Sequence, residues 1–403
     1  MASAPCHGRE RPRLAVVVSH PIQYFVAWHR AVHRLGEIRQ RVFFCSRRGL
    51  DRYFDPGFGS QLRWDIPLLG GYEHEFLDPP RIRARGRLDN PTVCEFLSRF
   101  EPRYLLIFGY AHPTNWRALR WARSNGARTL MFADSNARTP TPRWKGIAKR
   151  IVLNPFYRRL DGALYVSDAA YGYHRHYGLP PERLFPCPFP IDIERMRRAA
   201  PDREGARGEI RERHSIPRDA FLALHVGKYQ PYKRQLDLLS AAIRLRQQGH
   251  DVWCLLVGDG PDRERIARFI ADRALDWAIL TGFVNQAEIP HYYASADVLV
   301  LPSTREAYGL SATEALACGL PLVVSDRVGC LGGSARPGVN AFVHRAGDPC
   351  DLAAQLERLI LEPATRQRMS SASWEIAESQ TPERAARALV EALDQVESKA
   401  RTG

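Results

Sequence analysis

Residues 301–321, which read LPSTREAYGLSATEALACGLP, decide the fold. After an apolar run, a polar loop carries Glu306 and Gly309, and the pattern predicts a helix that begins near Leu310 and ends at Gly319. A buried strand, a short loop and a helix in this order are typical of parallel sheets, in which ligands bind beyond the carboxyl ends of the strands. The first N–H groups of such a helix lack backbone partners, so we expect the loop to favour an anion such as phosphate.

The same alternation of apolar runs and helical patterns extends on both sides of this segment. In the second half of the chain we expect strands at Phe221–Val226, Val252–Val257, Ala278–Gly282, Val298–Leu301 and Leu322–Val324, with helices at Tyr232–Gln248, Asp262–Arg273 and Leu310–Ala317. In the first half we expect strands at Leu14–Val18, Arg41–Phe44, Tyr104–Phe108, Arg128–Phe132 and Ala163–Val166, with helices at Ile22–Leu35, Thr92–Phe100 and Asn115–Ser124. This order predicts an α/β protein with two Rossmann-like, doubly wound domains.

The length of 403 residues is enough for two domains with separate cores. A polar stretch rich in Arg and Glu, near 191–217, is expected to link them. We place the first domain at 1–195 and the second at 196–375, followed by a helix at 376–403 that packs back toward the first domain. The carboxyl ends of the two sheets should then face each other across an interdomain cleft, which is the expected site.

The composition of the chain argues against several classes of function. The formal net charge is +14, but the arginines are spread over both halves without a basic stripe interleaved with aromatic residues, so we do not expect nucleic acid as a partner. No apolar stretch is long enough for a signal peptide or a membrane span, which predicts a cytoplasmic protein. The eight cysteines are scattered without metal-like spacing and are expected to be reduced structural thiols.

One segment, 143–152, has an amphipathic pattern. Trp144, Ile147, Ala148 and Ile151 would share one helical face, with cations on the other. Two interpretations stay open: the helix rests on anionic lipid at the inner face of the plasma membrane, or it packs on its own sheet with a solvated basic face.

Two carboxylates and a glycine of the central segment lie on the predicted loop and the start of the predicted helix. Gly309 would let a diphosphate approach the backbone closely. Glu314 lies about one turn inside the predicted helix, where a carboxylate can accept hydrogen bonds from both hydroxyls of a ribose. Glu306, upstream on the loop, is placed for the hydroxyls of a sugar at the other end of the diphosphate.

These residues resemble the Glu-x7-Glu motif of retaining glycosyltransferase family four, the glycosyl transferases group 1, through Glu306, Gly309-Leu310 and Glu314-Ala315. Over about residues 220–330 the resemblance extends in order and spacing to Val226-Gly227-Lys228, Lys233, Leu256-Val257-Gly258-Asp259-Gly260-Pro261, Thr281-Gly282-Phe283-Val284 and Ser325-Asp326. It implies the GT-B fold and a nucleotide-diphosphate-sugar donor. The residues it implies as donor contacts are Gly227, Lys228, Lys233, Gly258, Phe283, Val284, Gly309, Leu310 and Glu314.

The resemblance implies that Lys228 and Lys233 hold the diphosphate. The family usually has arginine where this chain has Lys228, so the charge is kept while the two-pronged hydrogen bonding of a guanidinium is lost. Transfer of a sugar leaves negative charge on the departing nucleotide, and Lys228, Lys233 and the helix start supply positive potential. No Asp-x-Asp motif is apparent. We therefore expect a reaction without metal or other cofactor.

The first half resembles one bacterial branch of this family more loosely, through 19–24, 55–59, 64–72 and 109–113. His20, after the first strand, is implied to approach the donor phosphate or the acceptor.

Two further catalytic candidates, with Glu306 and Lys233, are His112 and Asp134. Each follows a predicted strand and should project into the cleft. Family members often have a histidine near the second position, where this chain has Asp134-Ser135-Asn136, so the identity of a general base stays open.

The predicted function is that of a retaining glycosyltransferase, which moves a sugar to a hydroxyl of a glycan or lipid-linked acceptor in cell-envelope or extracellular polysaccharide or glycolipid synthesis. Three alternatives are kept: another enzyme of the same fold, such as a sugar-nucleotide epimerase or a phosphorylase, a natural-product glycosyltransferase, and a scaffold that binds sugar nucleotides without catalysis.

Overall fold

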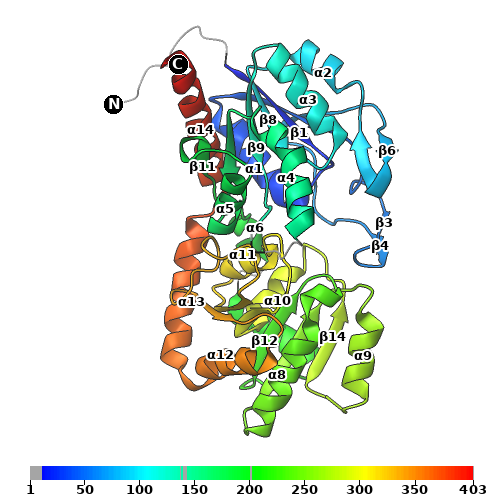
Figure 1. Ribbon diagram of the computed structural model, residues 1–403. Coiled ribbons are helices and arrows are strands. Elements are labelled where there is room, and N and C mark those ends of the chain that lie inside the picture. The colour runs from blue at the N-terminus through cyan, green and yellow to red at the C-terminus, as the bar shows by residue number, and fades with distance from the viewer. Residues whose placement is uncertain (1–10, 137, 139–142, 200–201, 403) are drawn as a thin grey trace.

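The computed structural model describes residues 11–136, 138, 143–199 and 202–402. Two parallel α/β domains lie one above the other, and the C-terminal helix returns to the first domain (Figure 1). The fold class predicted from the sequence is confirmed.

The first sheet has seven strands in the order β11-β10-β9-β8-β1-β2-β5, and every neighbouring pair is parallel. These strands are β1 (Arg13–Val18), β2 (Arg39–Phe44), β5 (Glu73–Phe76), β8 (Tyr104–Phe108), β9 (Arg128–Phe132), β10 (Gly162–Tyr165) and β11 (Leu184–Pro186). Helices α1 (Gln23–Leu35) and α14 (Pro382–Thr402) contribute to the apolar cluster on one face. Those that contribute to the cluster on the other face include α2 (Val93–Phe100), α3 (Pro113–Ser124) and the end of α4 (Arg143–Tyr157).

The second sheet has six parallel strands in the order β14-β13-β12-β15-β16-β17. They are β12 (Phe221–Val226), β13 (Val252–Val257), β14 (Ala278–Gly282), β15 (Val298–Leu301), β16 (Leu322–Ser325) and β17 (Ala341–His344). One face packs on α10 (Ile289–Ser295), α11 (Leu310–Leu316) and α13 (Pro363–Glu378), the other on α8 (Gln235–Gln247), α9 (Arg263–Ala271) and α12 (Pro349–Leu361).

The central strands of both sheets are continuous apolar runs because helices cover them on both sides. β1 lies between β2 and β8, and β12 lies between β13 and β15, so each is the point at which the strand order reverses. The loops that follow these two strands therefore lie at the position where open parallel sheets bind ligands.

Several short elements were not predicted from the sequence. They include the antiparallel hairpins β3 (Tyr53–Asp55) with β4 (Ser60–Leu62) and β6 (Arg81–Arg83) with β7 (Arg87–Asp89), a helix α5 (Asp168–His176), and 3-10 turns at Ala84–Gly86, Pro181–Arg183 and Pro231–Lys233. The hairpin strands have three residues each and mixed polarity, so no apolar period marks them.

The polar stretch expected to link the domains contains two helices, α6 (Ile193–Ala199) and α7 (Arg203–Arg213). α7 packs against α10, and it is anchored by Arg211, which is buried. The Arg211 guanidinium donates to Asp297 at 2.9 Å and to the carbonyl of Pro217 at 2.8 Å. This charge-rich segment therefore contains a helix, and the buried guanidinium of Arg211 has hydrogen-bond partners within the protein.

The C-terminal helix α14 lies against α1, β10 and β11 of the first domain. Its buried residues Leu389 and Leu393 join the apolar cluster beneath that sheet. Glu383 pairs with Arg34 at 2.7 Å, and Glu397 pairs with Arg103. The end of the chain therefore ties the two domains together.

Helix α4 differs from one of the two interpretations of its amphipathic pattern. Trp144, Ile147 and Ile151 are 68%, 63% and 70% exposed, so this apolar face does not pack on the sheet. The helix is held instead by its last turns, where Phe156 and Tyr157 are buried. Lys149 lies over the rings of Tyr110 and Tyr173, so a cation faces inward.

None of the described helices combines the length and the apolar character needed to cross a bilayer.

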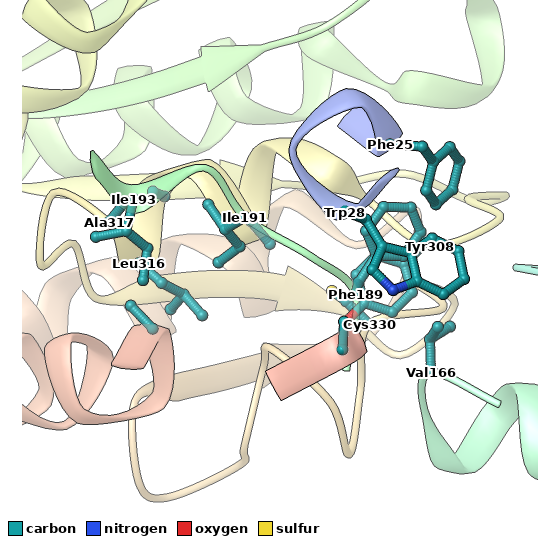
Figure 2. Close-up of a cluster of buried hydrophobic side chains, with 14 of the residues drawn as sticks. Phe25, Trp28, Val166, Phe189, Ile191, Ile193, Tyr308, Leu316, Ala317 and Cys330 are labelled. Atoms are coloured by element: carbon teal, nitrogen blue, oxygen red, sulfur yellow. The ribbon is translucent and has the colours of Figure 1, made fainter. Parts of the chain in front are cut away.

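One apolar cluster runs through both domains (Figure 2). At its centre Phe189 lies 5.3 Å from Phe25 and 4.9 Å from Tyr308, measured between ring centroids. Ile191 and Ile193 continue the cluster along the segment that joins the domains. This seam fixes how the two sheets face each other.

Replacing Phe189 with Ala should therefore weaken the junction as well as the core. We expect Phe189→Ala to lower the free energy of unfolding by about 3 kcal/mol or more, since the cavity left behind cannot collapse between two sheets. Chemical denaturation measures the loss. The matched change at the exposed Phe54 should cost less than about 0.5 kcal/mol, and an equal effect of the two variants would contradict the assignment of the seam.

Candidate active site

A cavity of about 750 Å³ lies between the two domains. Its walls come from the loops that follow β1, β8 and β9 in the first sheet and β12, β13, β14 and β15 in the second. It collects side chains that are far apart in the sequence. The predicted site residues that line it are His20, Asp134, Gly227, Lys228, Lys233, Gly258, Phe283, Val284, Glu306, Gly309, Leu310 and Glu314.

His112 is the exception among the predicted residues, because it does not appear in the described lining of this cavity. It precedes α3, and its Nδ1 accepts a hydrogen bond from the backbone N–H of Leu88 at 3.0 Å. The β6–β7 hairpin next to it uses the imidazole as an anchor. His112 does follow β8, but its imidazole contacts the hairpin and not the described lining of the cavity, so the predicted position of this side chain is wrong.

Glu306 and Lys233 form an ion pair in the cavity wall, with only 13% and 14% of their side chains exposed. Ser303 Oγ donates to the same carboxylate oxygen at 3.4 Å. The loop that carries Glu306 is held from the opposite domain, since Asn136 Nδ2 donates to the backbone carbonyl of Glu306 and, at 2.7 Å, to that of Ala307. Two residues predicted for sugar and phosphate are thus in direct contact.

One carboxylate oxygen of Glu314 is available to accept a hydrogen bond from a ligand. Its carboxylate is 6% exposed, and Oε2 accepts from the hydroxyl of Tyr293 at 2.6 Å, while Oε1 has no hydrogen-bond partner among the described residues. Burial raises the pKa of Glu314, against the opposing effects of the Tyr293 hydrogen bond and the nearby charge of Arg195. A buried oxygen left unsatisfied beside a cavity is suited to a hydroxyl of a ligand.

Lys228 reaches across the cleft. Its Nζ lies 2.9 Å from the carboxylate of Asp55, at the end of β3 in the first domain. Burial raises the pKa of Asp55, but the hydrogen bond and charge of Lys228 and the N–H groups of Gly57 and Phe58 outweigh it, so the pKa is lowered overall. Asp55 was not recognised as a site residue, although it stands in the segment 55–59 that carries the looser resemblance. Its partner is 173 positions away.

Two glycines allow the close backbone packing of the cavity floor. A Cβ at Gly258 would lie 1.9 Å from the carbonyl oxygen of Gly227, which only glycine avoids. Gly309 has φ of +101° and is the N-cap of α11, with no hydrogen bond from a capping side chain. Leu310 and Ser311, the first residues of this uncapped helix, line the cavity.

His20 and Asp134 bring titratable groups from the first domain. Burial lowers the pKa of His20 to about 4, helped by the charges of Arg48 and His112 and opposed by Asp55, so the imidazole is neutral near neutral pH. The Asp134 side chain opens onto the cavity. Desolvation by the surrounding cavity walls raises the pKa of Asp134, and the negative charge of Glu306 adds to this, while a backbone hydrogen bond opposes it. The residue is itself exposed to the cavity, so water screens part of this effect. Both are polar groups suited to contact a ligand. The contact of His20 with the donor phosphate or the acceptor and the catalytic role of Asp134 stay predictions.

Among the described residues, no group of three His, Cys, Asp or Glu side chains is arranged to hold a metal ion.

Comparison with known proteins places the second domain in a family. Residues 206–375 match the family model described as Glycosyl transferases group 1. This segment is a glycosyl transferases group 1 domain. The domain holds the loops with Glu306, Gly309 and Glu314, and the N-terminal domain supplies the opposite wall of the cavity.

Curated relatives match parts of the chain. A D-inositol 3-phosphate glycosyltransferase of Thermobifida fusca (strain YX) is 32% identical over 273 residues, which cover 62% of this chain and 58% of that protein. An alpha-D-kanosaminyltransferase of Streptomyces kanamyceticus is 31% identical over 170 residues, 42% of this chain and 44% of that protein. The chain thus spans less than two thirds of the length of these two relatives.

The fold agrees over nearly the whole chain with a solved structure, HepE of Anabaena in complex with UDP. The two superpose with a TM-score of 0.72 at 17% sequence identity, over 95% of this chain and 99% of that one. The fold is therefore the two-domain GT-B fold of glycosyltransferases, as predicted.

The raised pKa of Asp134 has a consequence for stability. A carboxyl whose pKa is higher in the folded than in the unfolded protein destabilises the fold above its unfolded pKa of about 4, and the penalty disappears as the pH falls below that value. Because Asp134 is exposed to the cavity, water screens much of this penalty. We expect Asp134→Asn to raise the thermal unfolding midpoint slightly at pH 7.5 and to raise it less at pH 4.5. The exposed Asp51→Asn controls for removal of a charge. A lower midpoint for Asp134→Asn at pH 7.5 would contradict the electrostatic argument.

Proposed function

We propose that this chain is a retaining glycosyltransferase that transfers a sugar from a nucleotide-diphosphate-sugar donor to a hydroxyl acceptor. One observation carries the proposal: Glu306, Lys233 and Glu314 of the glycosyl transferases group 1 domain line a single interdomain cavity that is large enough for a sugar nucleotide. The spacing of Glu306 and Glu314, seven residues between them, supports the Glu-x7-Glu type.

Each end of the donor finds suitable groups. The ribose hydroxyls would donate to Glu314, whose Oε1 is unsatisfied in the protein alone. The diphosphate would lie between Lys228, Lys233 and the uncapped first turn of α11. The transferred sugar would then lie near Glu306, which accepts from its hydroxyls. This orientation is the one that the family resemblance of these residues implies.

The chemistry needs negative charge to be stabilised on the leaving nucleotide as the bond from the anomeric carbon to the phosphate oxygen breaks. Lys233 is held beside Glu306, and Lys228 is held by Asp55, so both ammonium groups are oriented before the donor arrives. We propose that these two cations replace a metal ion. Closure of the two domains would exclude water, which protects the donor from hydrolysis.

The surface of α4 and the segment around it suggests where the acceptor comes from. Between Ser135 and Leu160 the sequence has seven Arg and Lys residues and no Asp or Glu, and α4 exposes Trp144, Ile147 and Ile151 on this segment. Apolar side chains flanked by cations suit the interface of an anionic membrane. We propose peripheral contact with the inner face of the plasma membrane and a lipid-linked or glycan acceptor of envelope or extracellular polysaccharide synthesis.

A small-molecule acceptor is the second candidate. The name of one relative, a D-inositol 3-phosphate glycosyltransferase, contains a small polar acceptor and favours an acceptor of this kind. The two candidates differ in whether a membrane is needed.

The donor assignment is tested by replacing the paired residues. A panel of uridine, guanosine and adenosine diphosphate sugars first identifies the donor through the rise in the thermal unfolding midpoint. We then expect Glu306→Gln and Lys233→Ala to lower the rate of nucleoside diphosphate release by about 10²-fold or more.

The exposed Glu182→Gln serves as the control and should keep the wild-type rate. All assays contain excess chelator, in which the wild type should stay active if the reaction needs no metal. Wild-type rates in both Glu306→Gln and Lys233→Ala would refute the site, and a rate restored only by a divalent ion would refute the metal-free proposal.

Membrane contact is tested with vesicles. We expect the protein to sediment with phosphatidylglycerol vesicles and not with phosphatidylcholine vesicles, and the bound fraction to fall with added salt because of charge screening. Ile147→Ser with Ile151→Ser should abolish the binding. Ile82→Ser, which removes an equally exposed apolar side chain from another surface, should not. Binding that survives the double change would contradict a role for α4.

A further inference from the structure

The segment 53–65 of the first domain reaches over to the glycosyl transferases group 1 domain. It comprises the hairpin β3–β4 and the three residues after it, and Figure 1 shows the hairpin at the edge of the first domain next to the second. Besides the Lys228–Asp55 pair, Gln230 Nε2 donates to the carbonyl of Gly57 at 3.0 Å. Asn285 Nδ2 donates to the carbonyl of Arg63 at 2.7 Å. The segment is therefore fastened to the loop after β12 and to the loop after β14.

Three aromatic rings meet where this segment crosses the cleft. Phe58 and Trp64 come from the segment, and Phe283 follows β14. The ring centroid of Phe283 lies 5.1 Å from that of Phe58 and 6.1 Å from that of Trp64, with the planes strongly inclined in both pairs. All three rings are only partly buried, and all three line the cavity. They form an apolar wall that is contributed by both domains.

The position of this aromatic wall, defined as Phe58, Trp64 and Phe283, follows the proposed order of donor groups. Lys228 Nζ lies 4.7 Å from the ring centroid of Phe58, so the wall begins next to a proposed phosphate contact. Val284 and Glu314 line the same cavity on the side of the group 1 domain. A nucleoside whose phosphates lie at Lys228 and whose ribose lies at Glu314 would bring its base toward these rings.

A partly exposed aromatic wall is unfavourable in water and favourable against a flat ligand. Nucleobases stack on aromatic side chains, or meet their edges, whatever the base, because every base has a π face. Phe54 provides the contrast on the same hairpin: it is 56% exposed and does not belong to the described lining of the cavity. An aromatic residue of this hairpin can therefore be exposed without facing the cavity, whereas Phe58 and Trp64 do line it.

We propose that Phe58 and Trp64 of the first domain bind the nucleobase of the donor together with Phe283. This inference rests on the proposed nucleotide-sugar donor and adds that the base is read by both domains. Because the segment 53–65 is fastened to the second domain, base binding and the closed arrangement of the domains stabilise each other. A donor without a base would lose this coupling.

The test compares a nucleotide with a ligand that has no base. Binding of UDP, GDP, ADP and inorganic pyrophosphate is measured by calorimetry for the wild type and for Phe58→Ala, Trp64→Ala and Phe54→Ala. We expect Phe58→Ala and Trp64→Ala to weaken binding of the preferred nucleotide by about 5- to 100-fold each. Pyrophosphate affinity should stay unchanged, and Phe54→Ala should bind both ligands like the wild type. Phe58→Leu keeps an apolar side chain for folding and should lose nucleotide affinity as well.

The outcomes separate this inference from the function on which it rests. If the wild type binds a nucleotide and both alanine variants bind it equally well, the aromatic wall is refuted while the donor proposal stands. If the variants lose nucleotide and pyrophosphate to the same extent, the rings act through Lys228 and the base assignment is refuted. If the wild type binds none of the nucleotides, the proposed function fails, and the inference fails with it.

Discussion

The packing of Phe189 between Phe25 and Tyr308 is the contact on which the arrangement of this protein depends. Each parallel sheet by itself ends in a row of loops with unpaired polar groups. Because one apolar cluster continues from the first sheet through the connecting segment to the second, the two rows face each other across the cleft. α14 adds a second tie by returning to α1. The interdomain cavity is thus a consequence of core packing.

Both lysines of that cavity are paired with carboxylates before any ligand enters. Lys233 has Glu306 as a partner within the group 1 domain, and Lys228 has Asp55 as a partner across the cleft. A largely buried cation such as Lys233 would be costly without a partner, and Lys228, which is about half-buried, is paired as well. A diphosphate would compete with these carboxylates or share the ammonium groups with them. The second pair lies between the domains, which links occupation of the proposed phosphate site to their relative position.

The same segment that supplies Asp55 also supplies the rings of Phe58 and Trp64. A single hairpin of the first domain therefore meets both the phosphate side and the base side of the proposed donor site. The segment is fastened to two loops of the second domain, where the side-chain amides of Gln230 and Asn285 donate to the backbone carbonyls of Gly57 and Arg63. These hydrogen bonds depend on side chains of the second domain and not on those of the segment. In the proposed arrangement the N-terminal domain therefore contributes to the donor site as well as to the acceptor side.

Helix α4 has the opposite character, because it turns its apolar residues outward. Amphipathic patterns indicate that one face is apolar, but they do not indicate what covers it. In this chain Leu153 and Phe156 hold the helix to the domain, and the preceding turns stand free of the sheet. The exposed apolar surface beside a run of cations is what distinguishes a proposed membrane contact from an ordinary surface helix.

The sequence by itself determined the parallel α/β class and the placement of the main strands. β12, β13, β14 and β15 begin and end where their apolar runs do, because a strand covered on both faces is marked locally by its composition. It also determined the loop with Glu306, Gly309 and Glu314, since strand, turn and helix signals lie within twenty residues of each other. Only the tertiary structure decided that His112 anchors a hairpin, that Asp55 pairs with Lys228, and that Phe58 meets Phe283. These contacts join residues far apart in the chain, and no local period or turn signal encodes which side chains the packing of two domains brings together.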